Sequence, residues 1–136
     1  MDEIKNKLLL VDDDASSLME MIGILKNDYE ISTVKNAYSA IEKARTFQPD
    51  LILMDVVMPG MSGFDAMESL KQLDSTKNIP VIFISGADDN SDERRGLELG
   101  AIDYIRKPMD EVIVRLRVQY HISIINRLRE AERKEW

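Results

Sequence analysis

The 136-residue sequence contains no cysteine and one histidine, His121. The absence of cysteine excludes a disulfide scaffold and thiolate metal sites. A single histidine excludes His-rich zinc sites and disfavours a Ser-His-Asp hydrolase. No apolar run reaches the ~18–20 residues of a membrane span, and residues 1–7 are too charged for a signal peptide. We therefore expect a cytoplasmic protein that does not enter a membrane.

Positive charge is also scarce, with 18 Lys and Arg against 25 Asp and Glu, a formal net charge of −7. An acidic chain without a basic patch is a poor direct partner for nucleic acid. Hydrophobic residues make up 44% of the chain, which excludes disorder as the main state. The length fits one domain with a sizeable core.

Short apolar runs alternate with stretches of helical periodicity. The runs occupy residues 8–11, 31–34, 51–54, 81–84 and 102–105, and continuous apolar runs are typical of strands covered on both faces. Helical spacing of apolar residues occurs in 16–26, 37–47, 64–73, 92–99 and from Asp110 onward. This alternation predicts an α/β fold: a doubly wound, flavodoxin-like sheet of five parallel strands in the order 2-1-3-4-5.

Three of the expected helices carry terminal signals. Asp14 or Ser16 is expected to cap the first helix and Ser62 the third, because their short side-chain oxygens accept bonds from free N–H groups. Gly100 is expected to end the fourth helix in the left-handed conformation.

Residues that carry chemistry follow four of the five runs: Asp12, Asp13 and Asp14, then Asp55, then Ser85, then Lys107. In an open parallel sheet, ligands bind outside the carboxyl ends of the strands, where the strand order reverses. We therefore expect these side chains to lie together on one rim of the sheet.

Carboxylates that crowd one small space repel each other unless they are protonated or bridged by a cation. All-oxygen ligands favour a hard cation, and Mg²⁺ fits such a set. A magnesium ion beside a carboxylate, a hydroxyl and a lysine suits a phosphoryl group, and a carboxylate can itself accept that group. The rim is therefore a candidate Mg²⁺-dependent phosphoryl site.

Four segments together resemble the receiver domain of bacterial two-component response regulators. They are residues 8–14, 51–63, 81–86 and 100–108, and the resemblance extends from residue 6 to about 120. It implies phosphorelay signalling, in which Asp55 takes a phosphoryl group from the phosphohistidine of a sensor histidine kinase or phosphotransfer protein. It also implies that the chain is no turnover enzyme beyond its own phosphorylation and dephosphorylation, so that any output enzyme lies outside it.

The resemblance implies roles at the acidic end of the site. Asp13 binds Mg²⁺ directly and Asp12 partly through water, while Asp55 and the carbonyl group of Val57 complete the protein ligands. Val57 lies two residues after the acceptor Asp55, and Ala87 lies two residues after Ser85. In the family, the residues at these two positions flank the water that attacks the phosphoryl group. Because neither side chain bonds a water, we expect slow self-dephosphorylation.

The resemblance also implies a switch. Ser85 is the hydroxyl that moves toward the phosphoryl group, and Tyr104 is the aromatic residue that turns inward afterwards. Lys107 pairs with the carboxylate and then with a phosphoryl oxygen, and the Lys107–Pro108 peptide bond is cis in this family. Gly86 departs from the family, in which alanine is usual at this position.

Two alternatives remain. The segment from Asp12 to Ser16 loosely matches the Asp-x-Asp signature of haloacid-dehalogenase-like phosphohydrolases, with Asp12 as nucleophile and Asp14 as general acid. The chain is short for that fold, has no cap insertion, and would leave the motif around Asp55 unexplained. A degenerate receiver that serves only as a protein-binding module is disfavoured by the complete set of site residues.

The last periodic stretch spans 27 residues from Asp110 to Trp136, and a helix of that length would extend about 40 Å. We expect its first turns to pack on the sheet through Val112, Ile113 and Leu116. An apolar stripe would then continue uncovered through Val118, Ile122, Ile125 and Leu128. We accordingly divide the chain into a receiver domain, 1–120, and a helical extension or linker, 121–136, toward a possible missing output domain. The stripe favours a homodimer through this helix. The family resemblance implies a second pairing surface, formed by the fourth helix, the fifth strand with Tyr104, and the final helix.

Overall fold

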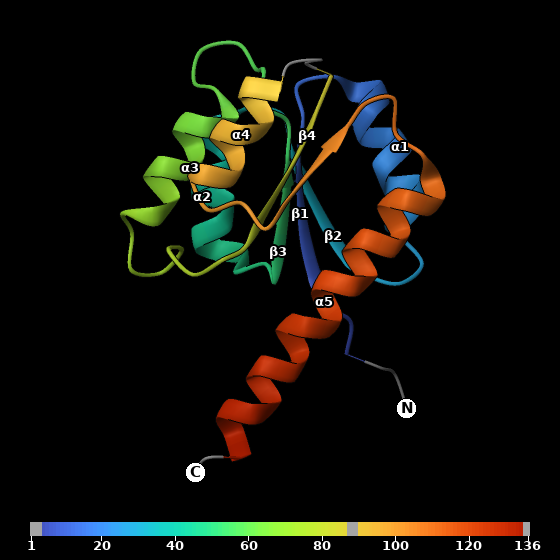
Figure 1. Ribbon diagram of the computed structural model, residues 1–136, viewed down its shortest axis with the longest axis vertical. Helices are drawn as coiled ribbons and strands as arrows, with labels where there is room; N and C mark the ends of the chain where they lie inside the picture. Colours follow the sequence, from blue (N-terminus) through green and yellow to red (C-terminus); the bar gives the residue numbers. More distant parts are fainter. Residues whose placement is uncertain (1–3, 87–89, 135–136) are drawn as a thin grey trace.

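Five parallel strands form one sheet at the centre of the molecule (Figure 1). The structure is a computed structural model that describes residues 4–86 and 90–134. The strands are β1 (Lys7–Val11), β2 (Glu30–Val34), β3 (Leu51–Met54), β4 (Val81–Ser85) and β5 (Asp103–Arg106). They lie in the order β2-β1-β3-β4-β5, which confirms the predicted fold class and strand order.

Five helices cover the two faces of this sheet (Figure 1). They are α1 (Ala15–Leu25), α2 (Ala37–Phe47), α3 (Gly63–Lys71), α4 (Asn90–Glu98) and α5 (Glu111–Lys134). Buried residues of α1 and α5 pack with one face of the strands, and those of α2 and α3 pack with the other. The α4 helix lies on the same side as α2 and α3.

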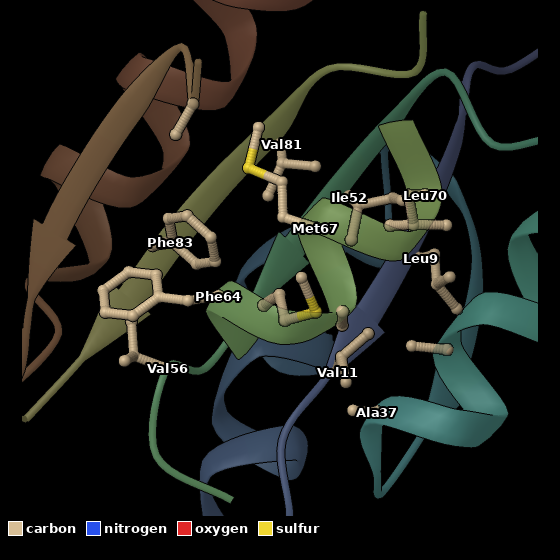
Figure 2. Packing of buried hydrophobic residues seen from close by; sticks show 14 of the residues in the cluster. Leu9, Val11, Ala37, Ile52, Val56, Phe64, Met67, Leu70, Val81 and Phe83 are labelled. Atoms are coloured by element: carbon tan, nitrogen blue, oxygen red, sulfur yellow. The ribbon is translucent and has the colours of Figure 1, made fainter. Parts of the chain in front are cut away.

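The central strands are apolar throughout because helices cover both of their faces. In β1, Leu8 and Leu10 point into the cluster beneath α1 and α5, whereas Leu9 and Val11 point into the opposite cluster, part of which Figure 2 shows. All four side chains are fully buried. Truncating one such leucine to alanine is expected to cost about 2–5 kcal/mol of stability.

The helix ends follow the predicted signals. Asp14 is the N-cap of α1 and accepts a bond from the Ser16 amide, while Ser62 caps α3 in a capping box with Asp65. Gly100 follows α4 with a φ of 103°, in the positive range that glycine tolerates. These caps place the first residues of α1 and α3 beside the carboxyl ends of β1 and β3.

The expected packing register of α5 is wrong. Its buried residues are Val114, Val118 and Ile122, whereas Val112, Ile113 and Leu116 are 57%, 44% and 58% exposed. The helix carries two apolar rows at i, i+4 spacing, and Val118 and Ile122, which were predicted to lie uncovered, belong to the row that meets the sheet. Leu128 is 60% exposed, as predicted. Sequence periodicity alone does not decide between two such rows.

Residues of α5 beyond position 120 also contact the rest of the domain, which the sequence analysis did not predict. Asp50 accepts a bond from the Lys7 amide at 2.7 Å and forms an ion pair with Arg129, and Asn6 bonds to Asn126. The helix runs without a break across residues 120 and 121, and its last turns project beyond the sheet (Figure 1). Among the described residues, no helix combines the length and apolar character required to cross a membrane.

Candidate functional site

Three carboxylates meet at the carboxyl ends of β1 and β3. These strands are neighbours with Val11 opposite Met54, so the residues that follow them lie side by side, and the Asp55 amide donates to the Val11 carbonyl at 2.9 Å. Carboxylate oxygens of Asp12, Asp13 and Asp55 all lie within 4.8 Å of one another. Asp12 and Asp55 are buried, and Asp13 faces solvent.

The side chain of Lys107 reaches this cluster from the end of β5. Its Nζ atom lies 2.8 Å from Oδ2 of Asp12 and 3.5 Å from Oδ2 of Asp55. Burial lowers the pKa of Lys107, but the bonds to Asp12 and the charge of Asp55 outweigh it and raise the pKa above its ordinary value. The lysine therefore stays charged between two buried carboxylates. The peptide bond between Lys107 and Pro108 is cis.

Asp55 is the carboxylate whose protonation is most perturbed. Burial raises its pKa from 3.8 to about 6, the Asp12 carboxylate acts in the same direction, and the nearby Lys107 ammonium opposes both. Near neutral pH the carboxyl group is thus only moderately biased toward its ionised form. Any cation that enters the cluster favours that form further, because it offsets the burial of negative charge.

Ser85 and Tyr104 lie on the α4 side of the adjacent strands. Ser85 ends β4 and is fully buried, and Tyr104 in β5 lies opposite Phe83. The Tyr104 side chain points inward and is 5% exposed. Burial raises the pKa of Tyr104, and the Ser85 hydroxyl acts in the opposite direction.

Three residues from the sequence analysis remain to be placed: Val57, Asp14 and Ala87. The Val57 amide donates to Oδ1 of Asp55 at 3.3 Å, and the Val57 side chain is 65% exposed. In the part of the chain that the structure describes, the cluster holds three carboxylates, and Asp14 lies instead at the cap of α1. Bonds from Ser16 lower the pKa of Asp14, as expected for a capping carboxylate. Ala87 lies outside the described residues.

Gly63 is a site residue that the sequence reasoning missed. A Cβ atom at this position would lie 2.2 Å from the backbone oxygen of Asp55. Its amide donates to the Val56 carbonyl at 2.8 Å, so the first residue of α3 packs directly on the backbone of the acidic loop. The sequence offered one signal for this contact, a glycine directly after the expected cap Ser62. Glycine is not a preferred residue at the first position of a helix, so its presence there can indicate a close neighbour.

Comparison with known proteins places this geometry in a family. Residues 8–119 match the family model described as the response regulator receiver domain. Response regulator PleD of Caulobacter vibrioides is 37% identical over 130 residues, which cover 93% of this chain and 29% of PleD. Protein PilH of Pseudomonas aeruginosa is 36% identical over 106 residues, which cover 77% of this chain and 88% of PilH.

The crystal structure of a response regulator from Desulfuromonas acetoxidans has 32% sequence identity and a TM-score of 0.80 over 88% of this chain and 98% of that structure. The chain spans less than a third of the length of PleD, whereas it covers most of PilH. These similarities give no support to a haloacid-dehalogenase-like phosphohydrolase that uses Asp12 and Asp14.

Proposed function

The chain belongs to the receiver-domain family of response regulators, a family of phosphorelay signalling, and on that premise we propose that Asp55 is its phosphoryl acceptor. The donor is the phosphohistidine of a sensor histidine kinase or of a phosphotransfer protein. The observation that carries the proposal is the cluster of Asp12, Asp13 and Asp55 with Lys107 between two of the carboxylates.

The cluster fits a magnesium ion by the chemistry of its donors. Three carboxylates supply only oxygen ligands, two of them are buried side by side, and Asp13 is open to solvent and to a hydrated ion. The proposed ligands are Asp13 directly, Asp12 partly through water, Asp55, and the Val57 carbonyl. When bound, Mg²⁺ supplies positive charge for the phosphoryl oxygens.

In the transfer, an oxygen of the Asp55 carboxylate bonds to phosphorus while the bond from phosphorus to the imidazole nitrogen breaks. The electron pair of that bond stays with the departing imidazole, and the product is an acyl phosphate on Asp55. Lys107 then pairs with a phosphoryl oxygen, and Ser85 donates its hydroxyl hydrogen to another. Tyr104 faces inward on the same side of the sheet and is the proposed aromatic switch.

The test is stoichiometric labelling by acetyl phosphate with Mg²⁺, read by intact-protein mass spectrometry. The wild-type chain should gain one phosphoryl group, and Asp55→Asn should gain none. Asp14→Asn is the matched control, because asparagine caps a helix as well as aspartate does and Asp14 lies outside the cluster. Full labelling of Asp55→Asn, or loss of labelling in Asp14→Asn, would contradict the assignment.

We also propose a domain organisation for the chain and a surface through which two copies pair. Residues 1–120 form the receiver domain, and 121–136 extend it as a helix or linker toward an output domain. Phosphorylation alters the surface of α4, β5 and α5, through which, or through α5 alone, two copies pair. The cytoplasmic location expected from the sequence stays a prediction.

A further inference from the structure

The ammonium group of Lys107 has a third partner besides its two carboxylates. Its Nζ atom donates to the hydroxyl oxygen of Ser17 at 3.4 Å, next to the 2.8 Å bond to Asp12 and the 3.5 Å ion pair with Asp55. An ammonium group carries three hydrogens and cannot accept a hydrogen bond. The three oxygens therefore match its three hydrogens, and Ser17 is the partner that has no role in the acidic cluster or in the transfer.

Ser17 reaches the site from a helix, whereas the two carboxylates follow strands. It is the third residue of α1 and is half-buried, and the next residue, Leu18, is buried in the cluster of apolar residues beneath the helix. This packing and the cap at Asp14 set the register of the first turn, which places the Ser17 hydroxyl beside Lys107. The lysine is thus held by α1 as well as by the ends of β1 and β3.

The hydrogen bond between Lys107 and Ser17 has one possible direction. The ammonium only donates, so the serine oxygen accepts, and the single hydrogen of the hydroxyl donates to Oδ2 of Asp14 at 3.1 Å. Hydrogen bonds from Ser16 and then from Ser17 lower the pKa of Asp14, so near neutral pH this carboxylate is ionised and only accepts. Asp14 therefore turns the lone pairs of the Ser17 oxygen toward the lysine.

A lysine that is already in place stabilises an incoming phosphoryl group better than one that must first be ordered. The side chain of lysine is long and flexible, so fixing its ammonium group costs conformational entropy. The two carboxylates leave one ammonium hydrogen over, and Ser17 accepts it. Because Ser17 is not a group that reacts, it can hold the ammonium both before and after Asp55 changes from a carboxylate to an acyl phosphate.

We propose that Ser17 is a positioning residue for the phosphoryl transfer, whose hydroxyl, turned by Asp14, holds the Lys107 ammonium ready for a phosphoryl oxygen. Ser17 acts through Lys107 and not on the phosphoryl group itself. The inference rests on the proposed function in one respect, that Lys107 meets the phosphoryl group.

The test compares Ser17→Ala with Ser16→Ala. The two serines are neighbours in the first turn of α1, and the hydroxyl of each donates to Asp14. Ser16 is exposed, and within the described residues its hydroxyl bonds to Asp14 alone. Each variant therefore removes one donor to Asp14 and introduces a good helix former, but only Ser17→Ala also removes the acceptor for Lys107. Ser17→Thr keeps the hydroxyl and should restore wild-type behaviour.

The first readout is the ¹⁵N resonance of the Lys107 ammonium group in the metal-free chain, which Lys107→Arg assigns. This measurement needs no phosphoryl donor. Ser17→Ala should shift the resonance and speed the exchange of the ammonium hydrogens with water, because a hydrogen bond that slows this exchange is lost. Ser16→Ala and Ser17→Thr should retain the wild-type signal.

The second readout is the rate of labelling by acetyl phosphate at saturating Mg²⁺. Ser17→Ala should label roughly threefold to tenfold more slowly, the factor that corresponds to one lost hydrogen bond, and the other two variants should keep the wild-type rate. An unchanged Lys107 resonance or a wild-type labelling rate in Ser17→Ala would overturn the proposal. Equal slowing in both alanine variants would also overturn it, because the cause would then be the weakened start of α1.

Failure of the proposed function has a different signature. The wild-type chain would then take no label from acetyl phosphate, while the ¹⁵N comparison of the two alanine variants would still report whether Ser17 holds Lys107.

Discussion

Gly63 and Asp55 make a backbone contact that leaves no space for a side chain. A Cβ atom on Gly63 would lie 2.2 Å from the Asp55 carbonyl oxygen and 3.1 Å from the Cα atom of Val56. Neither of these backbone atoms can turn away as a flexible side chain would. The first residue of α3 and the acceptor are therefore packed as one unit, although seven residues separate them in the chain.

Gly63→Ala should consequently disturb the acceptor as well as the fold. Overpacking of a tight site costs about 1–3 kcal/mol, and the displaced loop should label more slowly with acetyl phosphate. Gly86→Ala is the control, because its Cβ atom would meet Lys107 only at 4.0 Å, an ordinary contact. Urea unfolding and labelling rates measure the two effects. Equal stability and labelling of the Gly63 and Gly86 variants would show that the loop tolerates the extra atom.

Asp13 and Asp14 are neighbours with different expected roles, and alanine at each separates them. Asp13→Ala removes a proposed ligand and should weaken Mg²⁺ binding roughly tenfold or more, since one of three charged ligands is lost. Asp14→Ala removes the cap of α1 and should lower stability by about 1 kcal/mol with Mg²⁺ affinity retained. Isothermal calorimetry and thermal unfolding measure the two quantities. Undiminished affinity in Asp13→Ala would contradict the ligand assignment.

The raised pKa of Asp55 makes stability depend on pH when no metal is bound. The carboxyl group has a pKa of about 6 in the folded protein against 3.8 for the ordinary group, so folding favours the protonated form. The stability that the folded protein gains from protonated Asp55 is fully present below about pH 4 and is lost as the pH rises through 6.

Asp55→Asn should therefore be more stable than the wild-type chain at pH 7 by about 1–2 kcal/mol, a figure that allows for solvent screening at the open side of the site. The advantage should shrink as the pH falls toward 4. It should also shrink in excess Mg²⁺ at pH 7, because the ion binds the ionised wild-type site. Urea unfolding in EDTA and in Mg²⁺ measures this, and an advantage that is constant from pH 4 to 7 would rule out Asp55 as its source.

The sequence predicted the sheet well because its signals are local. Strands that are apolar throughout, such as Leu51–Met54, are buried on both faces and need no partner to be recognised. Residues directly after strands are brought together by strand order alone, so the placement of Asp12 beside Asp55 followed from the topology. The contact between Arg129 and Asp50 joins residues that are 79 positions apart, and no local sequence pattern predicts such a contact.

The close approach at Gly63 was missed for a related reason. A glycine in a sequence signals that something is near its backbone, but not which residue. The packing face of α5 was misassigned because two apolar rows run along the helix, and the choice between them depends on how the helix crosses the sheet.

Val57 bears on the lifetime of the phosphoryl group. Its amide bonds to Asp55 while its exposed apolar side chain stands beside the acceptor, where it offers no bond to an attacking water. Val57→Asn adds such a bond and should accelerate phosphate loss, whereas Val57→Leu should leave the rate nearly unchanged. The decay of the phosphorylated mass over time measures the rate. Equal decay in all three proteins would remove the role assigned to this side chain.

The exposed apolar row of α5 makes the homodimer testable by point substitution. The row comprises the exposed Val112, Leu116, Tyr120 and Leu128 and the half-buried Ile124, at i, i+4 spacing. Its far end lines a hollow with Pro80 and Ile102. Rows of this spacing pack into the grooves between like rows of a second helix. A chain shortened at Tyr120 would lose the buried Ile122, so a single charge on the row is the cleaner probe.

Leu116 is 58% exposed, so Leu116→Glu should leave the fold intact and place a charge inside the proposed interface. Gln119→Glu adds the same charge to an exposed position off the row and is the control. We expect sedimentation to show a dimer for the wild-type and Gln119→Glu proteins, strengthened by fluoroberyllate with Mg²⁺, and a monomer for Leu116→Glu. A wild-type chain that stays monomeric at high concentration with the mimic bound would refute pairing altogether. A Leu116→Glu protein that still dimerises would move the interface from this row to another part of the α4, β5 and α5 surface.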